Sequence, residues 1–316
     1  MLRLAVPDMV SNSFLPVLAA VDLGFFREEG LDASVELLSP LSATFAALRR
    51  GEMDLVAGAA HATLSAFPNW QGAKLLAAVS QHLFWVLVVR KDLGAARGDL
   101  GVVKGLRIGA APGPDAALRR LLLAAGIDPV RDRVHLETVP DSVASSTVSF
   151  GVTAAQALAE GRLDGFWANG MAAAVALRQG VGTLLLDVRS GDGPSVARDY
   201  TFPALAATEQ FLAEQPDTAA AAVRALVNAQ RALQADPDRA TEVGQRRFPP
   251  FEAGLIADVV RVDAPYYDPE ISEGAVASLN QFAQDMGRLQ NPVPYGQVVA
   301  TEMRPLWRPN STRCAG

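Results

Sequence analysis

The sequence contains few of the residues that build metal and redox sites. Its 316 residues include one cysteine, Cys314, and three histidines, His61, His82 and His135. A single cysteine excludes an intrachain disulfide, a Cys-x-x-Cys redox pair and a cysteine zinc cluster. The histidines lack the His-x-x-His and His-Glu-x-x-His spacings of common metal sites. We therefore expect this chain to hold no metal and no cofactor.

Basic residues and long apolar segments are scarce as well. The chain has 28 Lys and Arg against 34 Asp and Glu, a net charge of −6, and no block rich in Lys and Arg. This balance argues against nucleic acid or an anionic membrane surface as a partner. The longest uncharged stretches, 55–73 and 142–159, contain turn-forming or polar residues and do not have the pattern of a transmembrane helix.

The amino terminus does not have the features of a signal peptide. A short apolar run, Leu2–Val6, is ended by Pro7 and Asp8. Two interpretations stay open. Either the protein is cytoplasmic, or an export signal was removed and Met1 was added, in which case the protein is periplasmic or lipid-anchored outside the cell.

The sequence does contain the alternating pattern of a globular α/β protein. Half of the residues are hydrophobic, 20% are charged, and the length corresponds to about two domains. Apolar runs and helical patterns predict strands at 2–6, 33–38, 54–57 and 74–79, and helices at 14–26 and 42–50. This order is typical of βαβ units on a mostly parallel sheet. From Thr208 onward the pattern is helical, and we expect this tail to pack on the first part of the chain.

Three sequence marks recur in the same order about a hundred residues further along the chain. The pairs of similar segments are 2–7 and 106–112, 30–32 and 126–128, and 48–54 and 158–164. The repeat predicts two related α/β lobes. Chance similarity is the alternative, because the spacings between the marks differ.

One of these marks is part of a longer motif. Residues 24–32, Gly-Phe-Phe-Arg-Glu-Glu-Gly-Leu-Asp, follow the opening strand. They resemble the GFF-x-x-x-GLD signature of the type II solute-binding proteins of the nitrate, sulfonate and taurine class of ABC transporters, a superfamily that includes the NMT1/THI5-like proteins. The Gly-x-x-Asp segments 51–54 and 161–164 and the segment 292–295 are similar to further marks of this class. The resemblance covers residues 1–308.

This resemblance implies two lobes that close on a ligand about a hinge, in the form of a Venus flytrap. Each lobe is then a mostly parallel sheet flanked by helices, with the helical C-terminal tail on lobe one. Lobe one would consist of residues 1–88 and 200–316, and lobe two, which is inserted, of residues 89–199. The implied function is capture of a small molecule by a monomer that delivers it to the membrane permease of an ABC importer.

Polar residues in the strand-to-helix loops are the candidate ligand contacts. In open parallel sheets, ligands bind beyond the carboxyl ends of the strands. The candidates before the first crossing between the lobes are Ser11, Asn12, Ser13, Ser39, Ser42 and His61. The serines and Asn12 have an alternative role as helix caps. His61 has an alternative role as a hydrogen-bonded residue at the start of a helix.

Aromatic residues supply the other candidates. Trp167 lies at the exit of the strand that follows the second Gly-x-x-Asp mark, beside Asn169, and we expect both in the cleft. The alternative for Trp167 is a position in the core. Phe84 and Trp85 lie at the first crossing, where alternation along an extended chain predicts that only one side chain faces the cleft. We choose Trp85.

The loop that contains Pro112 and Asp115 bears on the ligand class. Asp115 stands at the start of a predicted helix, where the resemblance implies that anion-binding relatives have Ser or Thr. A carboxylate at this place competes with a bound anion. We therefore expect a small organic ligand with an aromatic or planar part, with or without one weak acidic group, rather than nitrate or taurine.

An enzyme of the same fold is the alternative function. The resemblance includes a desulfinase that depends on an active-site cysteine, a yeast-type pyrimidine synthase with a cysteine-rich motif, and menaquinone-pathway enzymes. The one cysteine, Cys314, lies in the terminal tail and fits neither the active-site cysteine of the desulfinase nor the cysteine-rich motif of the pyrimidine synthase. A Ser11, His61 and Asp8 arrangement has no Gly-x-Ser-x-Gly elbow to support it. We therefore expect a binding protein.

Overall fold

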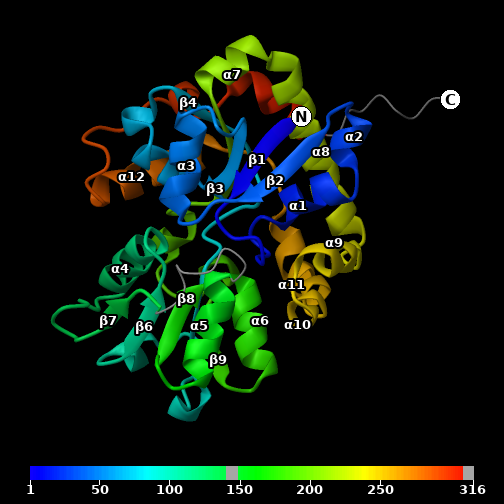
Figure 1. Ribbon diagram of the computed structural model, residues 1–316. Helices are drawn as coiled ribbons and strands as arrows, with labels where there is room; N and C mark the ends of the chain where they lie inside the picture. Colours follow the sequence, from blue (N-terminus) through cyan, green and yellow to red (C-terminus); the bar gives the residue numbers. More distant parts are fainter. Residues whose placement is uncertain (140–148, 309–316) are drawn as a thin grey trace.

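Two five-stranded sheets form the frame of the protein (Figure 1). The computed structural model describes residues 1–139 and 149–308. The first sheet has the order β2-β1-β3-β10-β4, and the second has the order β7-β6-β8-β5-β9. The strands are β1 (Leu2–Val6), β2 (Ala33–Leu37), β3 (Leu55–Ala59), β4 (Ala73–Ala78), β5 (Val86–Arg90), β6 (Arg107–Ala110), β7 (His135–Glu137), β8 (Gly165–Ala168), β9 (Gly182–Leu186) and β10 (Pro203–Thr208).

One strand in each sheet runs against its neighbours. In the first sheet, β1 pairs in parallel with β2 and β3, whereas β10 is antiparallel to β3 and β4. In the second sheet, β6 pairs in parallel with β7 and β8, whereas β5 is antiparallel to β8 and β9. The two-lobed α/β architecture with mostly parallel sheets that we expected is confirmed.

Helices flank both sheets and make up the last third of the chain (Figure 1). The α-helices are α1 (Leu15–Asp22), α2 (Phe25–Glu28), α3 (Leu41–Arg49), α4 (Pro114–Ala124), α5 (Phe150–Ala159), α6 (Gly170–Arg178), α7 (Glu209–Glu214), α8 (Pro216–Ala235), α9 (Arg239–Arg247), α10 (Pro250–Ala253), α11 (Ile256–Asp263), α12 (Glu273–Asp285) and α13 (Tyr295–Val298). Short 3₁₀ helices include η1 (Ala60–Ser65), η3 (Lys91–Leu93), η5 (Val188–Ser190) and η8 (Thr301–Trp307). Within the described ranges, no helix is both long enough and apolar enough to cross a bilayer.

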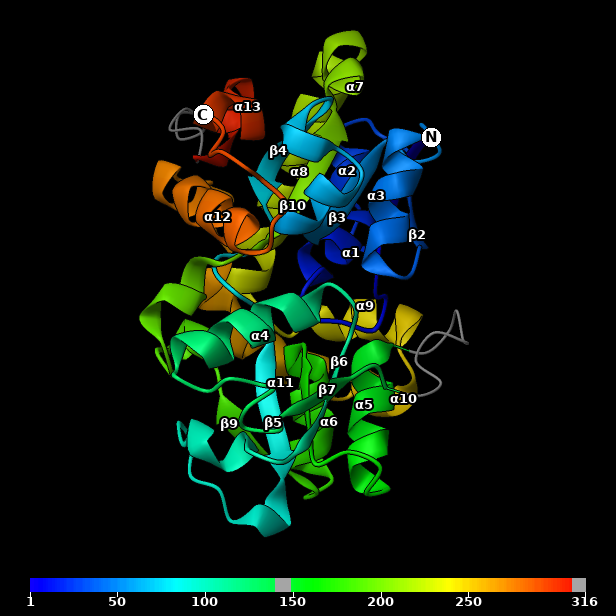
Figure 2. The same cartoon turned by 90° about the vertical axis from the view of Figure 1, so that its left-hand side faces the viewer.

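The helical tail packs mainly on the first sheet and its helices, as expected. The long helix α8 contacts α1 and α2, η8 contacts α8 and β4, and α12 contacts η1. Figure 2 shows α8, α12 and α13 beside the first sheet. Two tail helices also reach the second lobe, because α11 contacts α6 and α12 contacts the 3₁₀ helix η6 (Ser195–Asp199). The tail therefore also bridges the two lobes.

Two predicted helices are each divided in the structure. The helix expected at 14–26 is split into α1 and α2 at Gly24, whose φ of 91° is in the left-handed region that favours glycine. The helical pattern expected from Thr208 onward is divided into α7 and α8 at Pro216, which begins α8 because a proline fits the first turn of a helix.

The repeated Gly-x-x-Asp marks make the same contacts in both sheets. Asp54 accepts hydrogen bonds from the backbone nitrogen of Arg3 at 2.7 Å and from its guanidinium at 2.9 Å. Asp164 accepts the equivalent bonds from Arg107 at 3.0 and 3.1 Å. In both sheets the guanidinium also donates to the carbonyl of the motif's glycine at 3.0 Å. The marks therefore fasten β1 and β6 to the segments that lead into β3 and β8.

Candidate functional site

The strand-to-helix loops of the two sheets meet around a cavity of about 200 Å³. The first sheet contributes the loops after β1 and β2 and the end of β3, and the second contributes the loops after β6 and β8. The segment that enters β5 completes the wall. This is the edge at which ligands of open α/β sheets bind.

Seven of the predicted site residues line this cavity: Ser11, Ser13, Ser39, Trp85, Pro112, Trp167 and Asn169. The Ser11 hydroxyl accepts a hydrogen bond from the backbone nitrogen of Ser13 at 3.1 Å within the loop, and it does not cap α1, whose N-cap residue is Phe14. Asn169 caps α6, because its Oδ1 accepts a bond from the backbone nitrogen of Ala172 at 3.1 Å. The Ser13 hydroxyl is buried and has no hydrogen-bond partner among the described residues. It is therefore available to a ligand.

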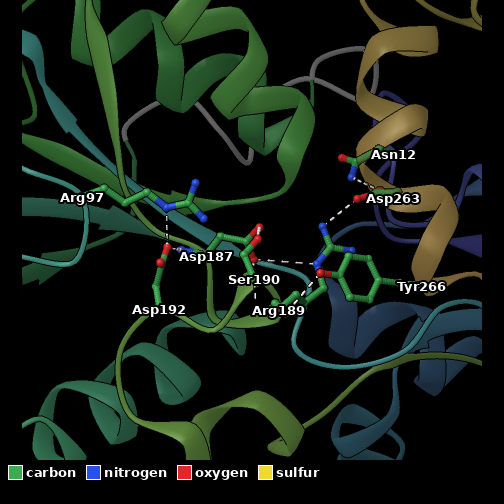
Figure 3. Close-up of polar contacts among 8 residues, drawn as sticks. All are labelled: Asn12, Arg97, Asp187, Arg189, Ser190, Asp192, Asp263 and Tyr266. Atoms are coloured by element: carbon green, nitrogen blue, oxygen red, sulfur yellow. Dashed lines mark hydrogen bonds and ion pairs between the residues drawn. The ribbon is translucent and has the colours of Figure 1, made fainter.

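Asn12 is not in the described lining of this cavity. It bridges the two lobes, and Figure 3 shows its contact with Asp263. Its Nδ2 donates to Asp263 at the end of α11 at 2.5 Å, and its Oδ1 accepts from the backbone nitrogen of Met171 in α6 at 2.9 Å. Asp263 also forms a buried ion pair with Arg189 at 2.6 Å. The guanidinium of Arg189 lies 4.8 Å from the centre of the Tyr266 ring. Asn12 is thus part of a polar network that connects the lobes.

Three further predicted residues line an adjoining cavity. Ser42, His61 and Asp115 surround a volume of about 400 Å³ that shares Leu41 and Pro112 with the first cavity. The sequence alone could not separate these residues from the others, because all of them lie in strand-to-helix loops or helix starts at the same edge. The start of α4 and its preceding turn line both volumes.

His61 has the hydrogen-bonded position at a helix start that was its alternative role. Its Nδ1 is 3.0 Å from the hydroxyl of Thr201, and burial together with the positive charge of Arg288 lowers its pKa to about 4. The carboxylate of Asp8 is bound instead by Ser149 and Asn169. Among the described residues, no relay therefore joins Ser11, His61 and Asp8.

Both aromatic residues at the first crossing line the cavity, so the expectation that only one of them does is wrong. Phe84 and Trp85 precede β5, where the chain lacks the regular pleat that alternates side chains, and their ring centres are 4.4 Å apart. The rings of Trp85 and Trp167 are 6.4 Å apart. Trp167 is fully buried, donates its Nε1 hydrogen to the carbonyl of Pro114 at 3.2 Å, and forms part of the cavity wall.

Asp8 is a candidate ligand contact that the sequence analysis considered only in a catalytic arrangement with Ser11 and His61. It is the one titratable side chain in the described lining of the cavity and is only partly accessible. Its Oδ1 accepts from the backbone nitrogen of Val10 at 3.1 Å, and its Oδ2 accepts from the hydroxyl of Ser149 at 2.6 Å and the amide of Asn169 at 3.3 Å. Desolvation raises its pKa to about 6. The available signal was its place directly after β1, in the loop with Ser11 to Ser13.

The described residues contain no cluster of three or more histidine, cysteine or carboxylate side chains that could hold a metal ion. No curated protein sequence matches the chain. Solved structures show which proteins share its fold, and a family model shows its family.

Several solved structures share the fold. A protein of Bordetella bronchiseptica RB50 has a TM-score of 0.71 and 22% identity, with 96% of each chain covered. The alkanesulfonate-binding protein SsuA from Xanthomonas axonopodis pv. citri, bound to MOPS, has a TM-score of 0.69 and 14% identity, with 96% of each chain covered. The desulfurization enzyme DszB has a TM-score of 0.63 and 17% identity over 96% of this chain and 97% of that one. The fold therefore occurs in binding proteins and in an enzyme.

The family assignment comes from the sequence. The NMT1/THI5 like family model matches residues 11–240, which include nine of the ten described strands. This match confirms the resemblance that residues 24–32 and the Gly-x-x-Asp marks indicated. The chain belongs to the NMT1/THI5 like family and has the two-lobed fold of the type II solute-binding proteins.

Proposed function

We propose that this protein is the solute-binding component of an ABC importer and captures a small planar organic molecule in the cavity between its two sheets. The observation that carries the proposal is the cavity wall, to which loops of both sheets contribute. A molecule in this cavity would contact both lobes at once. Such contacts favour the closed arrangement of the lobes over an open one.

The chemistry of the wall supports a planar ligand. Small-molecule sites are mostly apolar and contain a few placed polar groups. Here Phe84, Trp85 and Trp167 supply aromatic surface, while Ser13 and Asp8 supply polar atoms. Aromatic rings bind flat molecules through stacked or edge-to-face contacts.

The proposed lobes follow the division expected from the sequence. Lobe one would be residues 1–88 with 200–316, and lobe two residues 89–199. The expected boundary between residues 88 and 89 falls inside β5, which begins at Val86 and belongs to the second sheet, so we move the first crossing to just before this strand and count 86–88 with lobe two. We further propose that the protein works as a monomer outside the cytoplasm and delivers its ligand to a membrane permease.

We propose binding without turnover. The single cysteine, Cys314, lies outside the described residues, and the described lining of the cavity offers no cysteine nucleophile. His61 is engaged with Thr201 and lines the adjoining cavity. A bound ligand should therefore be recovered chemically unchanged after long incubation. Its stoichiometric conversion would favour the enzyme alternative.

A thermal-shift screen against a library of small planar compounds tests the solute-binding role. Compounds that raise the melting temperature are then titrated by calorimetry against the wild type, Ala111→Trp and Ala96→Trp. Ala111 lines the cavity, so a tryptophan there should fill it and abolish binding. Ala96 is exposed in the second lobe, and Ala96→Trp should bind as the wild type does. Binding that survives Ala111→Trp, or a screen without any stabilising compound, would contradict the proposal.

A further inference from the structure

We propose, on the basis of the function proposed above, that the ligand is a planar nitrogen cation of the amidinium or protonated amino-heteroaromatic type, and that Asp8 binds its N–H groups. This assignment goes beyond the planar organic molecule inferred from the aromatic wall. It also replaces one option of the sequence analysis, a ligand that has a weak acidic group, with a ligand that has a positive charge. Three features support it, namely the partners of Asp8, the charges around the cavity and the aromatic rings beside it.

The carboxylate of Asp8 is held in a fixed orientation but has unused accepting capacity. Among the described residues, its Oδ2 accepts two hydrogen bonds, from Ser149 and Asn169, and its Oδ1 accepts one, from the backbone nitrogen of Val10. Each carboxylate oxygen has about two lone-pair sites. Oδ1 can therefore accept a further N–H group from a molecule in the cavity, which Asp8 lines.

No cationic side chain faces Asp8 from the described lining of the cavity, which contains no lysine, arginine or histidine. Arg247 touches Met9 of the same loop, and its guanidinium is paired with Asp22 at 2.5 Å. His61 and Arg288 line the adjoining cavity. A desolvated carboxylate without a cation is unfavourable, and a cationic ligand would supply the missing partner.

The uncharged donors around Asp8 favour its ionised form over the neutral acid. The hydrogen bonds from Ser149, Asn169 and the backbone nitrogen of Val10 stabilise the negative charge of Asp8 and lower its pKa. Desolvation has the larger, opposite effect, and the pKa is raised to about 6. At neutral pH most molecules therefore carry a negative charge in this cavity. An anionic ligand would be repelled by this charge, whereas a cation would be attracted.

The aromatic rings favour a flat cation in particular. Trp85 and Trp167 line the same cavity as Asp8, and their ring centres are 6.4 Å apart. Cations bind over the faces of tryptophan rings, and the attraction is larger where water is excluded. An amidinium or a protonated amino-heteroaromatic ring combines a flat face with N–H donors in its plane, so it can contact a ring and the carboxylate together.

Three probes of nearly the same shape but different charge test this assignment. They are benzamidine, which is a cation, benzamide, which is neutral, and benzoate, which is an anion. We expect the wild type to bind benzamidine about tenfold or more tightly than benzoate, with benzamide between them. In Asp8→Asn, the affinity for benzamidine should fall by about tenfold or more and that for benzamide by less than about threefold. Asp92→Asn, which removes an exposed carboxylate in η3, should change none of the three.

The wild type provides a second test that needs no variant. Benzamidine stays protonated between pH 7.5 and pH 5, whereas Asp8, with a pKa of about 6, takes up a proton. The affinity for benzamidine should fall by about tenfold over this range and that for benzamide should stay level. Three results would overturn the assignment. Benzoate could bind as tightly as benzamidine, or no probe could bind at all. Alternatively, Asp8→Asn could keep the preference for benzamidine over benzoate while the wild type shows a flat pH profile. The library screen, which contains compounds of every charge, separately tests whether the cavity binds a solute.

Discussion

At the scale of single residues, the carboxylate of Asp8, which we propose binds the ligand, lowers the stability of the unliganded protein. The pKa of its carboxyl is raised from 3.8 to about 6 by desolvation. Between these values the folded state binds the proton more tightly than the unfolded state, so the free energy of unfolding falls as the pH rises through this range. The destabilisation is absent below about pH 4 and complete above about pH 6. A residue kept in such a place is typical of a functional site.

Replacing this carboxyl should therefore stabilise the unliganded protein. We expect Asp8→Asn to raise the free energy of unfolding at pH 7.5 by about 1–3 kcal/mol, because a shift of about two pKa units corresponds to nearly 3 kcal/mol. The gain should disappear at pH 4. Urea unfolding of Asp8→Asn and the wild type at both pH values measures the difference, with Asp92→Asn as the matched surface control. A variant less stable than the wild type at pH 7.5 would show that the carboxyl stabilises the fold.

Trp167 combines a core position with a cavity position, so its replacement should affect stability and binding together. Trp167→Phe keeps an aromatic ring but removes the hydrogen bond to Pro114. We expect about 1–2 kcal/mol lower stability and about tenfold weaker ligand binding. Trp70→Phe is the matched control, because Trp70 is also fully buried but is not in the described lining of the cavity. Equal affinity losses in both variants would remove Trp167 from the site.

At the scale of elements, the sequence predicts the strands and the loops that form the site. The four strands expected before residue 80 occur as β1 to β4, because alternating apolar runs and flanking breakers are local signals. The partners of Asp8 could not be predicted in this way. Ser149 and Asn169 are 141 and 161 positions away, and only the packing of one lobe on the other brings them to the carboxylate. The spacing of residues along the sequence likewise could not show that Ser42 and His61 line a different cavity from Ser11 and Ser13.

The Arg–Asp contacts of the repeat give an element-scale prediction. Asp164→Ala leaves the backbone nitrogen and guanidinium of Arg107 without their carboxylate acceptor. We expect the free energy of unfolding to fall by about 1–3 kcal/mol, with ligand affinity unchanged, because this contact lies at the opposite end of the strands from the cavity. Asp54→Ala in the first sheet should lose a similar amount. Unchanged melting of both variants would show that these contacts do not stabilise the strands.

At the scale of the whole molecule, a buried polar network ties the second lobe to the tail of the chain. Arg189 follows β9, while Asp263 ends α11 and also accepts from Asn12 (Figure 3). Tyr266 donates its hydroxyl hydrogen to the carbonyl of Arg189 at 3.1 Å. Both charged side chains are almost fully buried, with 2% and 4% of their surface exposed. Removing one partner of such a pair leaves an uncompensated charge.

We therefore expect Asp263→Ala to lower the free energy of unfolding by about 2–4 kcal/mol. Asp187, 3.9 Å from the same guanidinium, should compensate only in part. Arg97→Ala breaks a more exposed ion pair with Asp192 in the same region and should cost less than about 1 kcal/mol. Chemical denaturation of both variants makes the comparison. A loss in Asp263→Ala no larger than that in Arg97→Ala would contradict a stabilising role of the network.

The most direct measurement is a crystal structure of the protein saturated with a compound that stabilises it in the screen. We expect density for one molecule in the cavity between the two sheets, flat against Trp85 or Trp167, with a polar atom within hydrogen-bond distance of Ser13 or Asp8. A fully occupied ligand at any other place on the protein, with this cavity left unfilled, would contradict the claim that the two lobes capture a solute between them.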